Sequence, residues 1–205
     1  MAMAREETIS PQPVLLGLLM GRPRHGYELY QELQVELGRV WQVGMSQLYA
    51  HLRQLEEAGL VAAHTEPQEA RPPRKVYHLT PEGEAAFHAW LRQPTPYVRH
   101  IRVEFPARLY FYRRLSLPGL EELVEAQKEV CQAQIGRFAR LAEDEEDDFR
   151  TLVLEFRQGQ LQAVVHWLDR CLEILAGPVR QGPPGPDGRR DVQESRTSQI
   201  GRENR

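Results

Sequence analysis

The sequence contains little cysteine and almost no lysine. Its 205 residues include two cysteines, Cys131 and Cys171, with no CxxC or Cys/His spacing, which argues against a zinc module or a disulfide framework. Lys75 and Lys128 are the only lysines, so arginine carries nearly all of the positive charge. The planar guanidinium suits phosphates and base edges, but coding bias is the explanation that we favour for the excess.

An excess of positive charge is also absent. The chain has 26 Lys plus Arg against 29 Asp plus Glu, for a formal net charge of -3. Even residues 1–92 hold nine basic and eleven acidic side chains. This balance argues against a protein that binds polyanions over its whole surface, whereas it leaves room for a local basic patch.

No apolar run approaches the roughly 18 residues of a membrane-spanning helix, and the N-terminus is polar and acidic where a signal peptide is basic and then apolar. We therefore expect a cytoplasmic protein with no membrane partner. GxSxG, HExxH, P-loop and GxGxxG motifs are absent as well. We expect no enzyme, no catalytic residues, no metal and no cofactor.

Changes in composition divide the chain into five segments. The QPTP stretch indicates a linker at 93–98 between two blocks at 13–92 and 99–175. Residues 1–12 form a polar arm that we expect to be flexible. Residues 176–205 are rich in glycine and proline and carry few large apolar side chains, so we expect a disordered tail.

The first block shows the element order of a winged helix-turn-helix. The pattern predicts helices from Ser10 or Pro13 to about Gly21, over 27–37, over about 44–59 and from Thr80, with strands at 60–65 and 75–79. An unrelated small α+β domain would fit the same order. The fold class that we expect is mainly α with a small β-hairpin wing, followed by a helical dimerisation domain.

The second block carries only helix signals. We expect a helix from Pro106 to about Leu115, another that restarts at 116–118, and a last one after the acidic run EDEEDD at 143–148. Two such long amphipathic helices need a partner, which is either each other or a second subunit. The acidic run is most simply a solvated connection, with a cation or a basic partner as the alternative.

The third predicted helix has a polar face that could read DNA. Leu48, Leu52 and Leu55 share one side, and about 100 degrees per residue places polar or small side chains on the other. The candidates for contacts to bases and phosphates are Ser46, Gln47, Tyr49, Ala50 and Arg53. Any amphipathic helix has a polar outer face, so this helix alone does not decide.

The predicted hairpin tip supports the DNA hypothesis. Arg71, Arg74 and Lys75 place three positive charges within five residues beside two prolines, which restrict the backbone. A solvated loop partly neutralised by Glu66 and Glu69 is the alternative. Helix and wing occupy the two places at which this architecture contacts a duplex.

Three stretches resemble the signature sequences of the PadR family of transcriptional regulators. They are LLGLLMGRPRHGYELYQEL at 15–33, SQLYAHLRQLEEAGLV at 46–61 and RKVYHLTPEGEAAFHAWL at 74–91. Their order and spacing are also similar to those of the family. Beyond residue 99, VEFPARLYFYRRLS followed by two long helices resembles the C-terminal domain of the virulence-activator-like branch.

The resemblance implies a homodimer that binds double-stranded operator DNA, usually as a repressor, with the C-terminal helices forming the dimer interface. It implies a phosphate contact for Tyr49 and a positioning role for Tyr77. For Tyr27 it allows a DNA contact, but we expect this ring to pack within the second helix. Ala50 stands where the family frequently has proline, a departure that concerns only the first turn of the helix.

The resemblance also implies that a small aromatic effector could stack on Trp90 or Trp167. The alternative for the whole chain is a winged-helix protein-protein adaptor that does not read DNA. Binding to the DNA upstream of the protein's own gene would separate the two hypotheses.

Overall fold

A computed structural model describes residues 9–67 and 73–175. Its elements, in chain order, are α1 (Gln12–Leu19), β1 (Arg24–His25), α2 (Gly26–Glu32), a π-helical turn η1 (Leu33–Leu37), α3 (Met45–Glu57), β2 (Val61–Glu66), β3 (Arg74–Leu79), α4 (Pro81–Arg92), α5 (Val98–Arg114), α6 (Leu120–Glu143) and α7 (Asp148–Leu175). The predicted tail and residues 1–8 of the predicted arm lie outside the described residues. Within the described ranges, no helix is both long and apolar enough to cross a bilayer.

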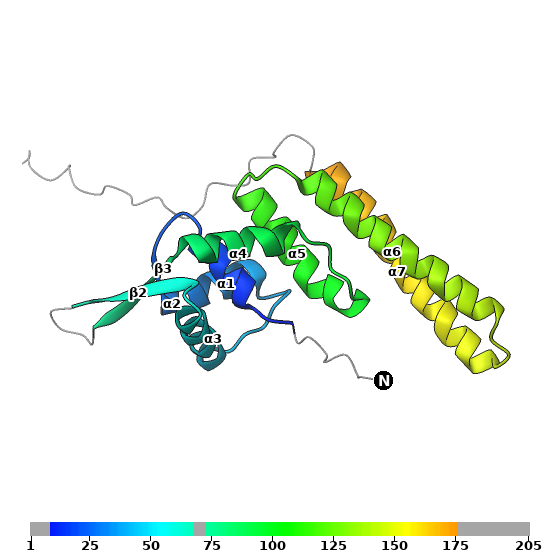
Figure 1. Cartoon of the computed structure of the whole chain (residues 1–205), viewed down its shortest axis with the longest axis horizontal. Helices are drawn as coiled ribbons and strands as arrows, with labels where there is room; N and C mark the ends of the chain where they lie inside the picture. The colour runs from blue at the N-terminus through cyan, green and yellow to red at the C-terminus, as the bar shows by residue number, and fades with distance from the viewer. Residues whose placement is uncertain (1–8, 68–72, 176–205) are drawn as a thin grey trace, which may run out of the picture.

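The N-terminal half is a winged helix, and the predicted fold class is confirmed. Three helices precede a hairpin that projects from one end of the molecule (Figure 1). The sheet has the order β1-β3-β2, with both pairs antiparallel. The two-residue strand β1 was not predicted, because Arg24 and His25 show no alternating pattern and join the sheet only by pairing with Tyr77 and Val76.

The leucine patterns of the first block form the core of this half. The side chains of Leu15, Leu18 and Leu29 are fully buried, as are those of Leu48 and Leu52 from α3. The second predicted helix is wrong in one respect, since α2 gives way to the π-helical turn η1 after Glu32. Its buried face is nevertheless the predicted one, because Leu33 and Leu37 remain in the core.

The helix α5 joins the two halves and corrects a predicted boundary. Proline was expected to start a helix at position 106, but α5 begins at Val98 and contains Pro106 in its interior. An interior proline removes one backbone hydrogen bond and costs about 3 kcal/mol. Burial of Ile101, Phe105 and Leu109 on the same helix offsets this cost, since each large apolar side chain contributes about 1.5–3 kcal/mol.

Close packing connects α5 to the winged helix. A methyl group on Gly17 of α1 would lie 2.5 Å from ring atoms of Phe87 and Phe111, so glycine is needed where these two rings meet the helix. The two rings pack edge to face, with centroids 5.1 Å apart. The core is therefore continuous from α1 through α4 to α5.

The two long helices form an antiparallel pair that extends away from the winged helix (Figure 1). The predicted restart at 116–118 is slightly early, because Gly119 has a φ of 99° and α6 begins at Leu120. The acidic run connects the end of α6 at Glu143 to the start of α7 at Asp148, as predicted. The helices pack against each other and still leave Phe149 and Phe156 mostly exposed.

The segment between α4 and α5 is held by buried hydrogen bonds. Thr95 is fully buried; its amide donates to Oε1 of Gln127 on α6 at 2.6 Å, and Nε2 of Gln127 donates back to the Thr95 carbonyl at 3.0 Å. The buried guanidinium of Arg108 donates to the Thr95 hydroxyl and, at 3.1 Å, to the Trp90 carbonyl. Burial lowers the pKa of Arg108, and an ion pair with Glu104 at 3.2 Å opposes this effect.

A second polar link lies on α2. Glu32 forms an ion pair with Arg24 of β1 at 2.8 Å, accepts a hydrogen bond from Nη2 of the same arginine at 3.4 Å, and also pairs with Arg114 at the end of α5. Arg24 in turn donates to the carbonyl of Leu18. Arg24 thus links β1 to α1 and α2, and Glu32 extends the link from α2 to α5.

Candidate nucleic-acid interface

The exposed face of α3 carries the residues that the sequence predicts for DNA contacts. Leu48, Leu52 and Leu55 are buried, which turns the opposite side of the helix to solvent. The exposed residues on that side include Ser46, Gln47, Ala50 and Arg53. Gln47 has an additional role, because its side-chain oxygen accepts a hydrogen bond from the Gly44 amide at 3.1 Å and so caps the N-terminus of α3.

The wing presents Arg74 and Lys75 to solvent. In the β2–β3 register Arg74 lies opposite Glu66 and Lys75 lies opposite Thr65. Val76 and Tyr77 follow in the strand and are buried, so they hold β3 against the domain while the two preceding cations stay exposed. Arg71, the third predicted wing residue, lies outside the described residues.

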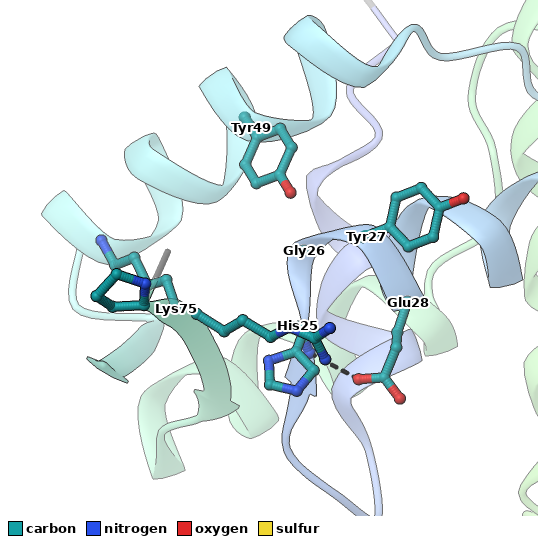
Figure 2. Close-up of a pocket in the computed structure, with 8 residues that line it drawn as sticks. His25, Gly26, Tyr27, Glu28, Tyr49 and Lys75 are labelled. Atoms are coloured by element: carbon teal, nitrogen blue, oxygen red, sulfur yellow. Dashed lines mark hydrogen bonds between the residues drawn. The ribbon is translucent and has the colours of Figure 1, made fainter. Parts of the chain in front are cut away.

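Wing, α2 and α3 enclose one concavity. It has a volume of about 440 Å³ and lies between the start of α2, the side of α3 and the wing (Figure 2). Its lining comprises His25, Gly26, Tyr27, Glu28, Tyr49, Pro73, Arg74 and Lys75. Two tyrosines and two cations from α2, α3 and the wing therefore line the same concavity.

Tyr27 belongs to this surface rather than to the core. The expectation that it packs within the second helix is wrong, since 53% of the residue is exposed. Its place at the start of α2 is fixed by the neighbouring His25, whose amide donates to the Glu28 carboxylate at 2.9 Å. The HGY sequence contained the signal for this residue, because an aromatic ring directly after the turn lies outside the Leu29–Leu33 stripe.

Tyr49 is positioned by a glycine. Figure 2 shows its ring reaching from α3 toward Gly26 at the start of α2. A methyl group on Gly26 would lie 2.5 Å from Cε1 and 2.9 Å from the hydroxyl of Tyr49. A residue larger than glycine at position 26 would therefore displace the Tyr49 ring. Tyr49 lies at the edge of the concavity and is 37% exposed.

The wing is tied to α3 by an ion pair. Nζ of Lys75 lies 2.5 Å from the carboxylate of Glu56, and this hydrogen bond raises the pKa of Lys75. The same ammonium lies 5.4 Å from the ring centre of Tyr77, and burial raises the pKa of that phenol. Lys75 thus has a protein partner in the position from which it could contact a phosphate.

The two tryptophans suggested for an effector lie in different surroundings. Trp90 on α4 packs edge to face on Phe111, and the Arg108 guanidinium lies 4.6 Å from its ring centre. Trp167 on α7 packs on Phe105 with centroids 6.0 Å apart and is 37% exposed. One face of Trp90 is thus already covered by a cation, whereas Trp167 is more open.

Two family models match successive parts of the chain. Residues 15–89 match the transcriptional regulator PadR-like family, and residues 101–176 match the virulence activator alpha C-terminal model. The negative transcriptional regulator PadR of Bacillus subtilis is 28% identical over 172 residues, which are 78% of this chain and 94% of the relative. A probable transcriptional regulator of Mycobacterium tuberculosis is 32% identical over 84 residues, or 41% of this chain and 44% of the relative.

Solved structures are also similar. Bacillus subtilis PadR in complex with operator DNA has 26% identity and a TM-score of 0.42 over 80% of this chain and 98% of its own. The same protein in complex with p-coumaric acid has 24% identity and a TM-score of 0.38 over 85% and 100%. The smu.1604c protein of Streptococcus mutans has 19% identity and a TM-score of 0.41 over 80% and 99%. With both halves matched by family models in the expected order, the chain belongs to the PadR-like family of transcriptional regulators.

Proposed function

We propose that this protein binds operator DNA as a homodimer and represses transcription. The observation that carries the proposal is the single surface on which the exposed face of α3 adjoins Tyr27, Tyr49, Arg74 and Lys75. In a winged helix-turn-helix the recognition helix enters the major groove while other elements contact the backbone. The surface has groups for both tasks.

The proposed division of roles follows from the chemistry of each group. Arg53 and Ser46 on α3 face the groove, where they can donate to base edges. Arg74 and the Tyr49 hydroxyl lie to the side of α3, where they donate to phosphates, and Lys75 can do the same in competition with its ion pair to Glu56. Arg71 belongs to the same proposed set. Because the chain as a whole is slightly acidic, affinity depends on these few contacts being made twice in a dimer.

Repression and effector control are proposed from the relatives. The Bacillus subtilis relative is named a negative transcriptional regulator and has been solved with operator DNA and with p-coumaric acid. A small aromatic effector of this chain would act only if it binds the DNA-competent and DNA-incompetent states unequally. Of the two tryptophans, Trp167 is the better exposed for stacking. We infer that the chain acts in the cytoplasm by binding and not by catalysis.

Duplex binding by the full-length protein tests the proposal. Fluorescence anisotropy would compare DNA from upstream of the protein's own gene with a scrambled duplex of the same composition. We expect Arg74→Ala to weaken both complexes similarly and to reduce the salt slope by about 1, and Arg53→Ala to reduce the difference between the two duplexes. Arg170→Ala, an exposed change on α7, is the control. Equal binding of both duplexes by the wild type, with a stoichiometric protein partner instead, would favour the adaptor.

A further inference from the structure

One face of the α6–α7 pair is apolar and only partly covered. At the C-terminal end of α7, Trp167 packs on Phe105 of α5, and Leu168 is buried. Toward the other end, Phe149, Leu152 and Phe156 are 72%, 61% and 66% exposed. We call these three residues and Val153 the apolar stripe; with about 100 degrees per residue they share one side of the helix. Exposed apolar patches of this kind mark interaction surfaces.

The middle of the same face contains a groove with a strong positive charge. It lies between α6, α7 and the start of α5 and has a volume of about 960 Å³. Its lining includes Arg99, Arg102, Arg137 and Arg157, and no carboxylate among the described residues lines it. We call it the arginine groove. Arg157 also lines a smaller hollow of about 320 Å³ formed with Leu141, Phe149 and Val153, so the groove and the stripe are continuous.

The far end of the pair carries the opposite charge. Six consecutive acidic residues at 143–148, which we call the acidic turn, run from the last residue of α6 through the connection to the first residue of α7. Two of them shape it, because Asp147 accepts from the Arg150 amide at 2.8 Å and Glu145 pairs with the Arg150 guanidinium at 3.7 Å. Asp144 and Glu146 are exposed. The turn therefore presents negative charge to a partner.

The order of these features along the face is acidic turn, apolar stripe, arginine groove. From Asp148 to Gln160 in the groove is about 18 Å at 1.5 Å per residue, and the midpoint falls beside Val153 in the stripe. An isologous two-fold contact places the same patches of two copies against each other in reverse order. A two-fold axis through the stripe would bring each acidic turn onto the partner's arginine groove and pack the two stripes together.

We propose that the acidic turn of one subunit binds in the arginine groove of the other, with the apolar stripes packed at the two-fold axis. The proposal rests on the proposed homodimer and specifies its register. Charge complementarity selects a second copy of this chain as the occupant, since the chain itself supplies the matching acidic group beside the matching apolar surface. A small organic anion would use the groove but would leave the apolar stripe uncovered.

Charge reversal on each side provides the test. The groove variant carries Arg102→Glu and Arg137→Glu, and the turn variant carries Asp144→Arg and Glu146→Arg, which leave the hydrogen bonds of Asp147 and Glu145 intact. Light scattering during size-exclusion chromatography would measure the mass of the full-length proteins. We expect each variant alone to raise the dimer dissociation constant about a hundredfold, because like charges then face each other twice. Arg39→Glu with Arg92→Glu, at exposed positions outside this face, should leave the dimer intact.

Mixing the two variants separates the proposal from simple loss of folding. In the mixed dimer one contact pairs glutamates with arginines in exchanged positions and the other pairs the native groups, so we expect the dimer to form again. Two variants that remain dimeric, or two monomeric variants that stay monomeric when mixed, would overturn the register. If added benzoate raises the melting temperature of the wild type but not of a groove variant that remains dimeric, the groove binds a small anion instead. A monomeric wild-type protein would refute the proposed homodimer itself, and with it the register.

Discussion

Lys75 of the wing and Glu56 of α3 form an ion pair with 2.5 Å between Nζ and the carboxylate oxygen. The pair connects the two elements that the proposed function places on DNA. In the free protein the Lys75 ammonium is paired with the Glu56 carboxylate, which holds the wing against α3. A DNA phosphate must compete with Glu56 for the same ammonium group.

Replacing Glu56 by glutamine should release this lysine. We expect Glu56→Gln to bind random duplexes more tightly and to steepen the dependence of log affinity on log salt by about 1, since one further phosphate is neutralised. Titration over a range of KCl concentrations measures the slope. Glu57→Gln removes the same charge from an exposed neighbour without freeing Lys75 and is the matched control. Identical slopes for the two variants would refute the competition.

The contact between Gly26 and Tyr49 predicts a second effect. Gly26→Ala should displace the Tyr49 ring and lower duplex affinity roughly tenfold, or about 1.4 kcal/mol. The crowding itself should reduce the free energy of unfolding by about 1–3 kcal/mol. Adding Tyr49→Ala to Gly26→Ala should restore stability but not DNA binding. Gly136→Ala, which meets nothing closer than 3.9 Å, is the control. A double variant no more stable than Gly26→Ala would contradict the steric explanation.

Arg108 predicts a third effect, on stability. Its removal would leave the Trp90 carbonyl, the Thr95 hydroxyl and the Glu104 carboxylate without their donor. We expect Arg108→Ala to lower the free energy of unfolding by roughly 3 kcal/mol, and Arg108→Lys to recover little of it, because lysine cannot form the same fork of hydrogen bonds. Urea unfolding measures the change. Arg113→Ala, an exposed change on the same helix, should stay within about 0.5 kcal/mol of the wild type.

The cysteines predict slow thiol chemistry. Burial raises the pKa of Cys171 to about 11, and burial also raises the pKa of Cys131. At pH 8 the Cys171 thiolate fraction is then about one in a thousand, and it increases with pH up to the raised value. Ellman's reagent should react slowly with the native protein and rapidly with both thiols in denaturant. Fast native reaction of one thiol would show that its helix pair opens.

The sequence predicted the elements whose pattern is local. Leucines spaced by three and four residues identify the buried face of α3, and the exposed candidates Ser46 and Arg53 follow from that face alone. The prediction that a helix starts at Pro106 was wrong, because a proline inside a helix is tolerated when burial of side chains on neighbouring turns offsets its cost. That burial depends on packing against other helices. The boundary of α5 could therefore not be read from its own residues.

The site was less predictable than the fold. Tyr49 reaches the start of α2 only because Gly26 leaves space between two helices, a relation that neither helix shows by itself. Gln47 fits the pattern of a residue that reads bases, yet its oxygen also caps the helix. The pairing of Lys75 with Glu56 depends on how the hairpin folds back onto α3. Such long-range relations have no periodic signature in the sequence.

The hydrogen bonds between Thr95 and Gln127 have a consequence for the DNA itself. They restrain the connection between the two halves of a subunit, and the ion pair between Glu32 and Arg114 ties α2 to α5 on another side. In a homodimer built on the long helices, we expect these bonds to hold the two recognition helices at one preferred separation as long as they remain formed. Such a protein selects operators by the spacing between their two half-sites. Lengthening the DNA between the half-sites by a single base pair would rotate one half-site away from its recognition helix.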